Sequence, residues 1–239
     1  MSVACVIPAR MESTRFPNKP LAKIDGKEMV LHTLERAALA SCFDLIVCAT
    51  NSEEIYSVVQ KHGFEAILTR DHPTGTDRVI EAAQKLNLDL VVNLQGDEPL
   101  IDLDLLRAVA KNIQLEPTSW ITAATPLLRE DYNNTNVVKI QVQNNYAQDF
   151  KRQISSNPTK SWLEHRGIYA YSSVAMQEFS HSPQTKDELL RSIEPLRVLG
   201  KRPIKVIFSP STSMAVDTPT DLLLVENVLK KSKHKMVLQ

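Results

Sequence analysis

The order of apolar and polar positions along this chain predicts alternating strands and helices in its first half. Val3–Ile7 and Leu45–Ala49 are short, continuous apolar runs, typical of strands buried on both faces of a parallel sheet. From Met29 to Ala40, apolar residues recur at helical spacing and polar residues occupy the opposite face. The pattern continues with a helix from Ser52 to about His62, a strand at Ala66–Thr69, a helix at Thr76–Leu86, a strand at Leu90–Leu94 and a helix at Leu103–Ile113. This alternation predicts an α/β fold with a mostly parallel central sheet and helices on both of its faces.

After about residue 118 the pattern becomes less regular, because polar, asparagine-rich segments separate the apolar stretches. The predicted elements of this half are strands at Trp120–Thr125, Val137–Val142, Gly167–Tyr171 and Ile204–Phe208, and helices at Lys186–Leu199 and Asp221–Lys230. We therefore predict one domain over residues 1–239, divided at about residues 118 and 200.

The composition fits a globular chain and excludes several classes of protein. The 239 residues are 43% hydrophobic, and 28 Lys and Arg balance 28 Asp and Glu. This balance gives no support for a nucleic-acid partner, which usually selects a basic excess. No apolar run approaches the roughly 20 residues of a membrane-spanning helix, and the N-terminus shows no secretory signal. We expect a cytoplasmic protein without membrane association, whose three cysteines are reduced thiols in or near the core.

The loop after the first predicted strand is unusually basic. Arg10, Arg15 and Lys19 lie within ten residues, together with the hydroxyls of Ser13 and Thr14. Prolines stiffen this loop, and because it contains no glycine it is neither a Walker A loop nor a dinucleotide-binding turn. Open α/β sheets bind ligands at the carboxyl ends of their strands, so the loop predicts a triphosphate site; the alternative is a solvated basic loop.

Further segments form an ordered series of motifs. They are Ile7-Pro-Ala-Arg10, Pro17-Asn-Lys-Pro-Leu21, Thr74-Gly-Thr-Asp-Arg78, Asn93-Leu-Gln-Gly-Asp-Glu-Pro99, His165-Arg-Gly-Ile-Tyr169 and Val216-Asp-Thr-Pro219. The series resembles the 3-deoxy-manno-octulosonate (Kdo) cytidylyltransferases, or CMP-Kdo synthetases, over nearly the whole chain. The resemblance implies a three-layer, Rossmann-like nucleotidyltransferase fold of the nucleotide-diphospho-sugar transferase type. It also implies transfer of CMP from CTP to the anomeric hydroxyl of Kdo, with release of diphosphate, in lipopolysaccharide biosynthesis.

The resemblance assigns roles to individual residues. The CTP-binding residues would be Pro8, Ala9, Arg10, Ser13, Arg15, Lys19, Thr74, Gly75 and Arg78. The sugar-binding residues would be Gln95, Arg152, His165, Tyr169 and Glu194. Arg10, Lys19 and Asp97 would act in catalysis. Residues 1–118 would bind CTP, 119–200 would bind the sugar and form a homodimer contact, and 201–239 would return to the main sheet.

Asp97 and Asp217 are the candidate magnesium ligands. Each is placed on a loop after a predicted strand, and Mg²⁺ prefers a few carboxylates supplemented by water and phosphate oxygens. From the residues alone, Asp217 is instead the N-cap of the helix that follows Thr218-Pro219. The two roles are compatible.

The chain departs from the family pattern at the sugar end. A usual tyrosine is Asp149 and a usual serine is Lys151, an amide within a predicted helix is replaced by Pro195, and Ala215 stands where the family has glycine. Two alternatives therefore stay open. One is a cytidylyltransferase for another acidic sugar, such as 8-amino-Kdo or a sialic-acid-like sugar, and the other is a CTP-binding relative with impaired turnover.

Overall fold

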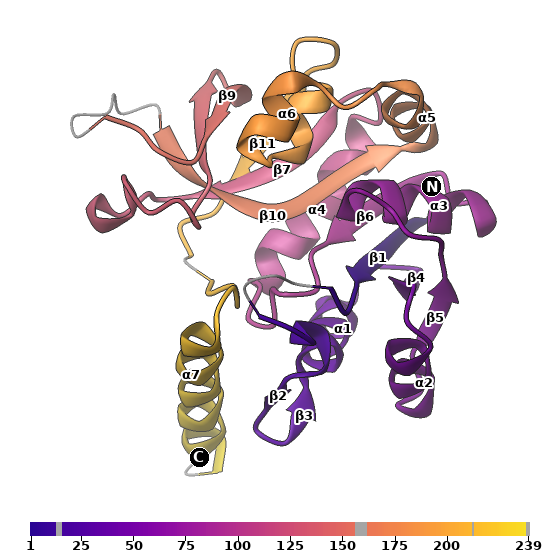
Figure 1. The fold of residues 1–239 in the computed structure, drawn as a ribbon, viewed down its shortest axis with the longest axis vertical. Coiled ribbons are helices and arrows are strands. Elements are labelled where there is room, and N and C mark those ends of the chain that lie inside the picture. Colours follow the sequence, from indigo (N-terminus) through magenta and orange to yellow (C-terminus); the bar gives the residue numbers. More distant parts are fainter. Residues whose placement is uncertain (13–15, 156–161, 212, 238–239) are drawn as a thin grey trace.

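The computed structural model describes residues 1–12, 16–155, 162–211 and 213–237. Within these residues, a nine-stranded sheet has the order β5-β4-β1-β6-β10-β7-β11-β9-β8 (Figure 1). Its strands are β1 (Val3–Ala9), β4 (Leu45–Thr50), β5 (Glu65–Leu68), β6 (Leu90–Leu94), β7 (Trp120–Thr125), β8 (Lys139–Gln143), β9 (Tyr146–Lys151), β10 (Trp162–Ser172) and β11 (Ile204–Phe208). The predicted strands of the first half are therefore confirmed to within about two residues.

The sheet is mixed, whereas the sequence pattern predicts a mostly parallel one. β4 runs parallel to β1 and β5, and β1 runs parallel to β6, as helical crossovers require. β10 then lies antiparallel between β6 and β7, and β9 pairs antiparallel with β8. The β8–β9 hairpin turns at Asn144 and Asn145, which both have positive φ, 52° and 65°. Two such residues are typical of a tight hairpin turn, so Asn144 and Asn145 join β8 to β9 directly.

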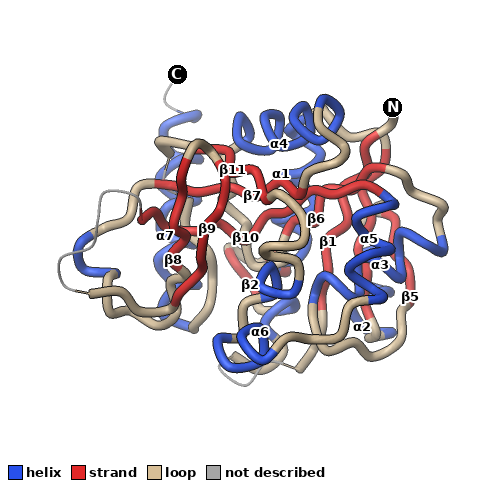
Figure 2. The backbone as a smooth tube through the Cα atoms, turned by 90° about the horizontal axis from the view of Figure 1, so that it is seen from above, coloured by secondary structure: helices blue, strands red, loops and turns tan. Residues whose placement is uncertain are grey.

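Helices pack on both faces of the sheet. They are α1 (Met29–Ala40), α2 (Glu53–Lys61), α3 (Gly75–Lys85), α4 (Leu103–Leu115), α5 (Ser173–His181), α6 (Lys186–Arg191) and α7 (Pro219–Val237). α1 and α4 contribute to one buried cluster with Cys5 and Ile7 of β1, and α3 and α5 contribute to another with Val6 (Figure 2). Alternate residues of β1 thus face opposite layers, as a strand buried on both sides requires.

The helix predicted at Lys186–Leu199 is wrong in its length. α6 ends at Arg191, Ser192 adopts a left-handed conformation with φ 52°, and a separate short 3₁₀ helix, η3, spans Glu194–Arg197. Pro195 explains the break, because proline lacks the backbone N–H that would bond the Arg191 carbonyl in a continuing α-helix and its ring clashes with that carbonyl. The strand predicted at Gly167–Tyr171 is longer, and α5 and β9 have no counterpart in the predicted pattern.

The C-terminal helix α7 lies beside the small hairpin of β2 (Lys23–Ile24) and β3 (Lys27–Glu28), away from most of the sheet (Figure 1). Its buried Val225 packs in a small cluster with Ile24, Met29 and Val216. Two more 3₁₀ helices are η1 (Lys19–Leu21) and η2 (Arg129–Asp131). Among the described helices, none combines the length and the apolar character that crossing a membrane demands.

The cysteines are free thiols. Cys5 and Cys48 are buried and Cys42 is half-buried, which confirms their prediction as core or near-core residues. Burial raises the pKa of the Cys48 thiol to about 12 and raises that of Cys5 further. Neither thiol is therefore ionised at neutral pH, which argues against a nucleophilic role.

Candidate active site

A cavity of about 550 Å³ opens at the carboxyl ends of β1 and β6, and we call it the β1 cavity. Its lining includes the predicted CTP-binding residues Pro8, Ala9, Arg10, Lys19, Thr74, Gly75 and Arg78, and also Asp97 and Asp217. Ser13 and Arg15 lie outside the described residues. The structure thus brings the basic loop, the Thr74 turn and both candidate metal ligands to one place.

Lys19 joins the two candidate metal ligands. Its Nζ donates to Asp97 Oδ2 at 2.6 Å and to the carbonyl oxygen of Val216 at 2.9 Å, and it lies 3.7 Å from Asp217 Oδ1. The Val216 N–H in turn donates to the carbonyl oxygen of Asp97 at 2.9 Å. A positive charge between two carboxylates holds both loops together at the mouth of the cavity.

The loop around Asp217 is ordered by Asp221. Oδ2 of Asp221 accepts from the backbone N–H groups of Asp217 at 3.0 Å and Thr218 at 2.8 Å, and Thr218 Oγ1 accepts from the Asp221 N–H. Thr218 therefore occupies the capping position of α7 that the sequence pattern gives to Asp217. This leaves the Asp217 carboxylate directed at Lys19 and at the cavity.

Asp97 and Asp217 fit a hard divalent cation. Their side chains are 28% and 26% exposed, supply only oxygen donors and line the cavity. Mg²⁺ commonly takes one or two carboxylates and completes its six ligands with water and phosphate oxygens. No cluster of three or more His, Cys, Asp or Glu suited to a metal occurs among the described residues.

Two glycines allow the loops around the cavity to approach closely. A Cβ on Gly96 would stand 2.9 Å from the carbonyl oxygen of Pro8, closer than side-chain carbons approach backbone oxygen. A Cβ on Gly75 would lie 3.3 Å from Gln95 Oε1 and 3.5 Å from Pro8 Cγ. Glycine at both positions lets the ends of β1 and β6 and the start of α3 meet without a gap.

Glu194 occupies the N-terminus of α3. Its carboxylate accepts from the N–H of Gly75 at 3.0 Å, from the N–H of Thr76 at 3.1 Å and from the Thr76 hydroxyl at 2.5 Å. Thr74 Oγ1 accepts from the N–H of Asp77, so these backbone donors are already engaged within the protein. Burial raises the pKa of Glu194, although the bonds from Thr76 and Gly75 favour its charged form.

Arg78 supplies a buried positive charge beneath the β1 cavity. The residue is 2% exposed, and Nη1 donates to Thr69 Oγ1 at 2.6 Å. Burial lowers the pKa of Arg78, and repulsion from Arg10 lowers it further. Arg10 is exposed, so the two guanidiniums place positive charge both at the wall and at the opening of the cavity.

A second cavity, of about 580 Å³, adjoins the first, and we call it the β10 cavity. Its lining includes all five predicted sugar-binding residues: Gln95, Arg152, His165, Tyr169 and Glu194. Four residues line both cavities: Gln95, Asp97, Glu194 and Asp217. The prediction that Gln95 lies where the two sites meet is consistent with this arrangement.

His165 and Tyr169 form a buried aromatic wall of the β10 cavity. Their ring centroids are 5.5 Å apart, and the His165 ring meets Phe150 edge-on at 5.3 Å. Burial, with a smaller contribution from Arg166, lowers the pKa of His165 to about 3, so its imidazole is neutral at neutral pH. Burial raises the pKa of Tyr169, which keeps its hydroxyl protonated.

Arg152 joins the C-terminal end of α6 to the loop before β8. Its guanidinium donates to the carbonyl oxygens of Arg191 at 2.7 Å, Thr135 at 2.8 Å and Ser192 at 2.8 Å. Asp149, one of the departures from the family pattern, accepts from Arg191 Nη1 at 2.7 Å. Neither Asp149 nor Lys151 is among the described residues that line the two cavities, and Lys151 Nζ lies 3.4 Å from Asp149 Oδ2 and 5.4 Å from the centroid of the Trp162 ring.

Sequence reasoning missed a buried ionic cluster beside His165. Arg166 is 4% exposed, and its guanidinium donates to Glu98 at 2.5 Å, Glu164 at 2.9 Å and Ser213 at 2.8 Å. All four residues line the β10 cavity. Burial raises the pKa of Glu98 and of Glu164, and Arg166 opposes this in both. The available signal was the run of three polar residues, 164–166, immediately before an otherwise apolar strand.

Known proteins match this chain along most of its length. A sequence profile of the family described as cytidylyltransferase matches residues 4–206. A 3-deoxy-manno-octulosonate cytidylyltransferase of Syntrophobacter fumaroxidans is 41% identical over 96% of this chain and 97% of that protein. One from Leptospira biflexa is 38% identical over 95% of this chain and 96% of that protein.

Solved structures agree. A CMP:2-keto-3-deoxy-manno-octonic acid synthetase complexed with CTP superimposes with a TM-score of 0.90 and 32% identity over 97% of this chain and 100% of that one. A thymidylyltransferase-like protein of Bacillus anthracis, 14% identical with a TM-score of 0.72 over 95% of both chains, shares the nucleotidyltransferase fold alone. These matches cover most of the chain, including the segments that form the two cavities. They show that this chain belongs to the 3-deoxy-manno-octulosonate cytidylyltransferase family.

Proposed function

We propose that this chain transfers CMP from CTP to the anomeric hydroxyl of 3-deoxy-manno-octulosonate. The observation that carries the proposal is the meeting of two cavities at Gln95, Asp97, Glu194 and Asp217. One is bordered by a basic loop suited to a triphosphate, and the other by hydrogen-bonding side chains suited to a polyhydroxylated acid. Reactants held at such a junction need little further loss of translational freedom to react.

In the proposed reaction the anomeric oxygen forms a bond to the α-phosphorus of CTP and the bond from that phosphorus to the bridging oxygen breaks. Diphosphate leaves with the bonding electrons, and the hydroxyl proton passes to water or buffer. Arg10 and Lys19 stand at the β1 cavity, where they would neutralise the charge that develops on the leaving group. Gln95 and Glu194 would fix the position of the acceptor against the nucleotide.

Magnesium completes the proposal as cofactor. Asp97 and Asp217 would hold Mg²⁺, which would supply further neutralisation of the phosphate oxygens. Lys19, which bonds Asp97 and lies 3.7 Å from Asp217, holds the two carboxylates side by side.

The assignment extends to the organisation of the chain. We assign CTP binding to about residues 1–118, sugar binding and a homodimer contact to 119–200, and a return to the main sheet to 201–239. The product would serve lipopolysaccharide biosynthesis in the cytoplasm, where CTP is available. Sedimentation of the purified protein tests the dimer: a monomer at micromolar concentration contradicts it.

The function is tested by diphosphate release from CTP and Mg²⁺ with a panel of 2-keto sugar acids that includes Kdo, 8-amino-Kdo and a sialic acid. We expect release with Kdo and its loss in Lys19→Met. The matched control is Lys27→Met, because Lys27 is a partly exposed lysine that pairs with Glu35 and lines neither cavity. Release only with another acceptor would replace the assigned sugar, and CTP binding without release would replace the assigned enzyme by a binding protein.

A further inference from the structure

Thr122 lies beneath the β10 cavity and does not line it. It is fully buried in β7, where it pairs with Tyr169 of β10 and Val206 of β11. Its hydroxyl oxygen is 2.9 Å from His165 Nε2 and also 2.9 Å from the carbonyl oxygen of Ile168. His165 and Ile168 both belong to β10. The buried hydroxyl of Thr122 thus connects the His165 imidazole, in the cavity wall, to the backbone of β10.

The direction of these two hydrogen bonds follows from the groups involved. A threonine hydroxyl has one proton to donate, and a carbonyl oxygen can only accept. The hydroxyl proton therefore points to Ile168. Towards His165 the hydroxyl oxygen can only accept, so Nε2 must carry a proton.

A neutral imidazole carries one proton in all, so a proton on Nε2 leaves Nδ1 with a free lone pair. Burial keeps His165 neutral, as its lowered pKa of about 3 indicates. His165 lines the β10 cavity, and its hydrogen bond among the described residues is made by Nε2. Nδ1 is absent from the fully buried atoms without a partner, so it is accessible from the cavity. Nδ1 is therefore the ring atom that can meet a ligand there, and it presents an acceptor.

We propose that Thr122 is a positioning residue that holds His165 in the Nε2–H tautomer, so that Nδ1 accepts a hydrogen bond from a hydroxyl of the bound sugar acid. The inference rests on the proposed function for the identity of the ligand. The opposite tautomer would present an N–H to the same hydroxyl and would favour an acceptor group there. By fixing the tautomer, Thr122 makes His165 Nδ1 an acceptor, which favours a ligand hydroxyl that donates its proton to Nδ1.

The tautomer is tested directly in the wild-type protein without substrates. In protein labelled with ¹⁵N-histidine, a long-range proton–nitrogen correlation spectrum distinguishes the protonated from the unprotonated ring nitrogen, and His165→Asn assigns the signal. We expect an unprotonated Nδ1 and a protonated Nε2 at neutral pH. The reverse pattern, or a doubly protonated ring, overturns the proposal.

Variants test the consequence. Thr122→Val removes the hydroxyl and keeps the branched shape; it should raise the KM for the sugar acid about three- to tenfold, the value of one hydrogen bond, and leave the KM for CTP unchanged. Thr122→Ser should restore both the tautomer and the KM. The matched control is Thr125→Val, because Thr125 is a buried threonine of the same strand whose hydroxyl has no partner among the described residues.

Either of two results overturns the proposal. One is that Thr122→Val retains the wild-type tautomer, and the other is that its KM for the sugar acid equals that of Thr125→Val. Should Thr122→Val fail to fold, the wild-type spectrum and Thr122→Ser still decide it. The spectrum of the free protein reports on Thr122 alone, whereas absence of diphosphate release with every sugar acid reports on the proposed function alone.

Discussion

The carboxylate of Glu194 accepts the backbone N–H of Gly75 at 3.0 Å, across 119 residues of sequence. With the bonds from Thr76, this contact ties η3, in the wall of the β10 cavity, to the first turn of α3, in the wall of the β1 cavity. A carboxylate at a helix N-terminus also interacts favourably with the helix dipole. The two candidate substrate sites therefore share one structural support.

Glu194→Gln should weaken that support. The amide keeps the size of the side chain, but its NH₂ group replaces one of the two accepting oxygens. This NH₂ group must then face a donor, from Gly75 or from Thr76, that it cannot accept. We expect a loss of about 1–3 kcal/mol in the free energy of unfolding, measured by urea denaturation. Glu178→Gln is the control, because the Glu178–Arg202 pair is at the surface, and it should cost less than about 1 kcal/mol. Equal stability of Glu194→Gln and wild type would contradict the structural role of this carboxylate.

Asp217→Asn should weaken the response to magnesium. If Asp217 is a magnesium ligand, loss of its charge should raise the Mg²⁺ concentration for half-maximal activity about tenfold, the equivalent of about 1.4 kcal/mol. Asp221→Asn is the control: it lies on the same segment and removes the same charge, and its remaining oxygen can still accept from Asp217 and Thr218. Identical magnesium titrations of the two variants would exclude Asp217 as a ligand.

Gly96→Ala should disturb the β1 cavity through the backbone. The new methyl group would stand 2.9 Å from the carbonyl oxygen of Pro8, so the end of β1 must move. We expect a loss of about 1–3 kcal/mol in stability together with a raised KM for CTP. Gly63→Ala is the control that separates the loss of stability from the change in KM. Gly63 has φ +79° and no atom within 4 Å of its Cβ position, so this variant should lose about 1 kcal/mol of stability and keep the wild-type KM for CTP. A normal KM for CTP in Gly96→Ala would contradict the role of this close approach.

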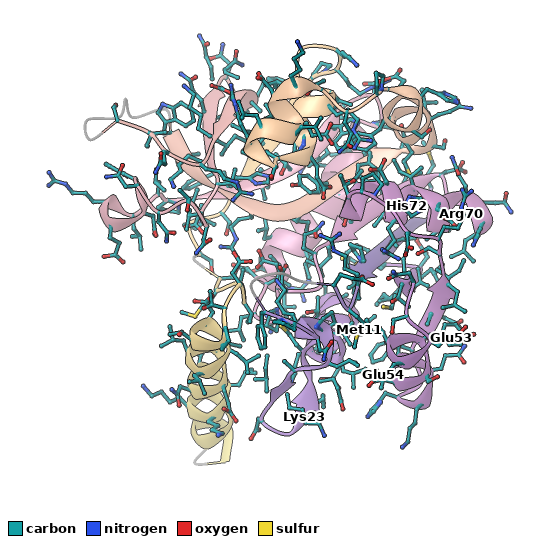
Figure 3. The ribbon with its side chains drawn as sticks, in the orientation of Figure 1. Met11, Lys23, Glu53, Glu54, Arg70 and His72 are labelled. Carbon is teal, nitrogen blue, oxygen red and sulfur yellow. The ribbon has the colours of Figure 1, made fainter. Side chains whose placement is uncertain are left out.

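Glu81 should make stability depend on acidic pH. Burial opposes its ionisation, but hydrogen bonds from Lys85, His72 and the Arg70 backbone outweigh burial and lower its pKa to about 2. Figure 3 shows Arg70 and His72 on the segment after β5, near α3. Because the pKa in the folded state lies below the ordinary value of 4.5, this stabilisation is complete above pH 4.5 and is lost as pH falls towards 2.

Urea denaturation of wild type and Glu81→Gln between pH 2 and pH 7 measures this dependence. The wild type should exceed the variant by about 1 kcal/mol at pH 7, allowing for solvent screening near the exposed Arg70, and the difference should vanish near pH 2. A difference that stays constant across this range would show that the Glu81 carboxylate titrates normally.

Much of the fold follows from local patterns, and the gaps have physical causes. The strand Leu90–Leu94 is predicted at its observed bounds because four of its five residues are apolar. β10 is underestimated because Glu164, His165 and Arg166 interrupt its apolar pattern. His165 and Arg166 are buried all the same and Glu164 is partly buried, since Arg166 pairs with Glu164 and with Glu98 from another strand end. Pairing of this kind depends on tertiary structure and leaves no local pattern.

The candidate site was predictable where loops leave neighbouring parallel strands. Arg10 and Asp97 follow β1 and β6, which are adjacent in the sheet, so their meeting follows from topology. The position of Thr122 was not predictable, because a threonine in a β-strand has no distinctive sequence pattern. Its function depends on which imidazole nitrogen the fold places above it, and that contact spans 43 residues.

The uninterrupted sheet from β5 to β8 has a consequence for how this protein can diversify. The predicted CTP-binding residues Pro8, Ala9 and Arg10 lie at the end of β1, whereas the predicted sugar-binding residues His165 and Tyr169 lie on β10, two strands away in the same sheet. Strands keep a spacing of about 4.8 Å whatever side chains they carry. Replacements along β10 and the hairpin beyond it can therefore broaden or narrow the range of sugars over evolutionary time, while the triphosphate end retains its geometry.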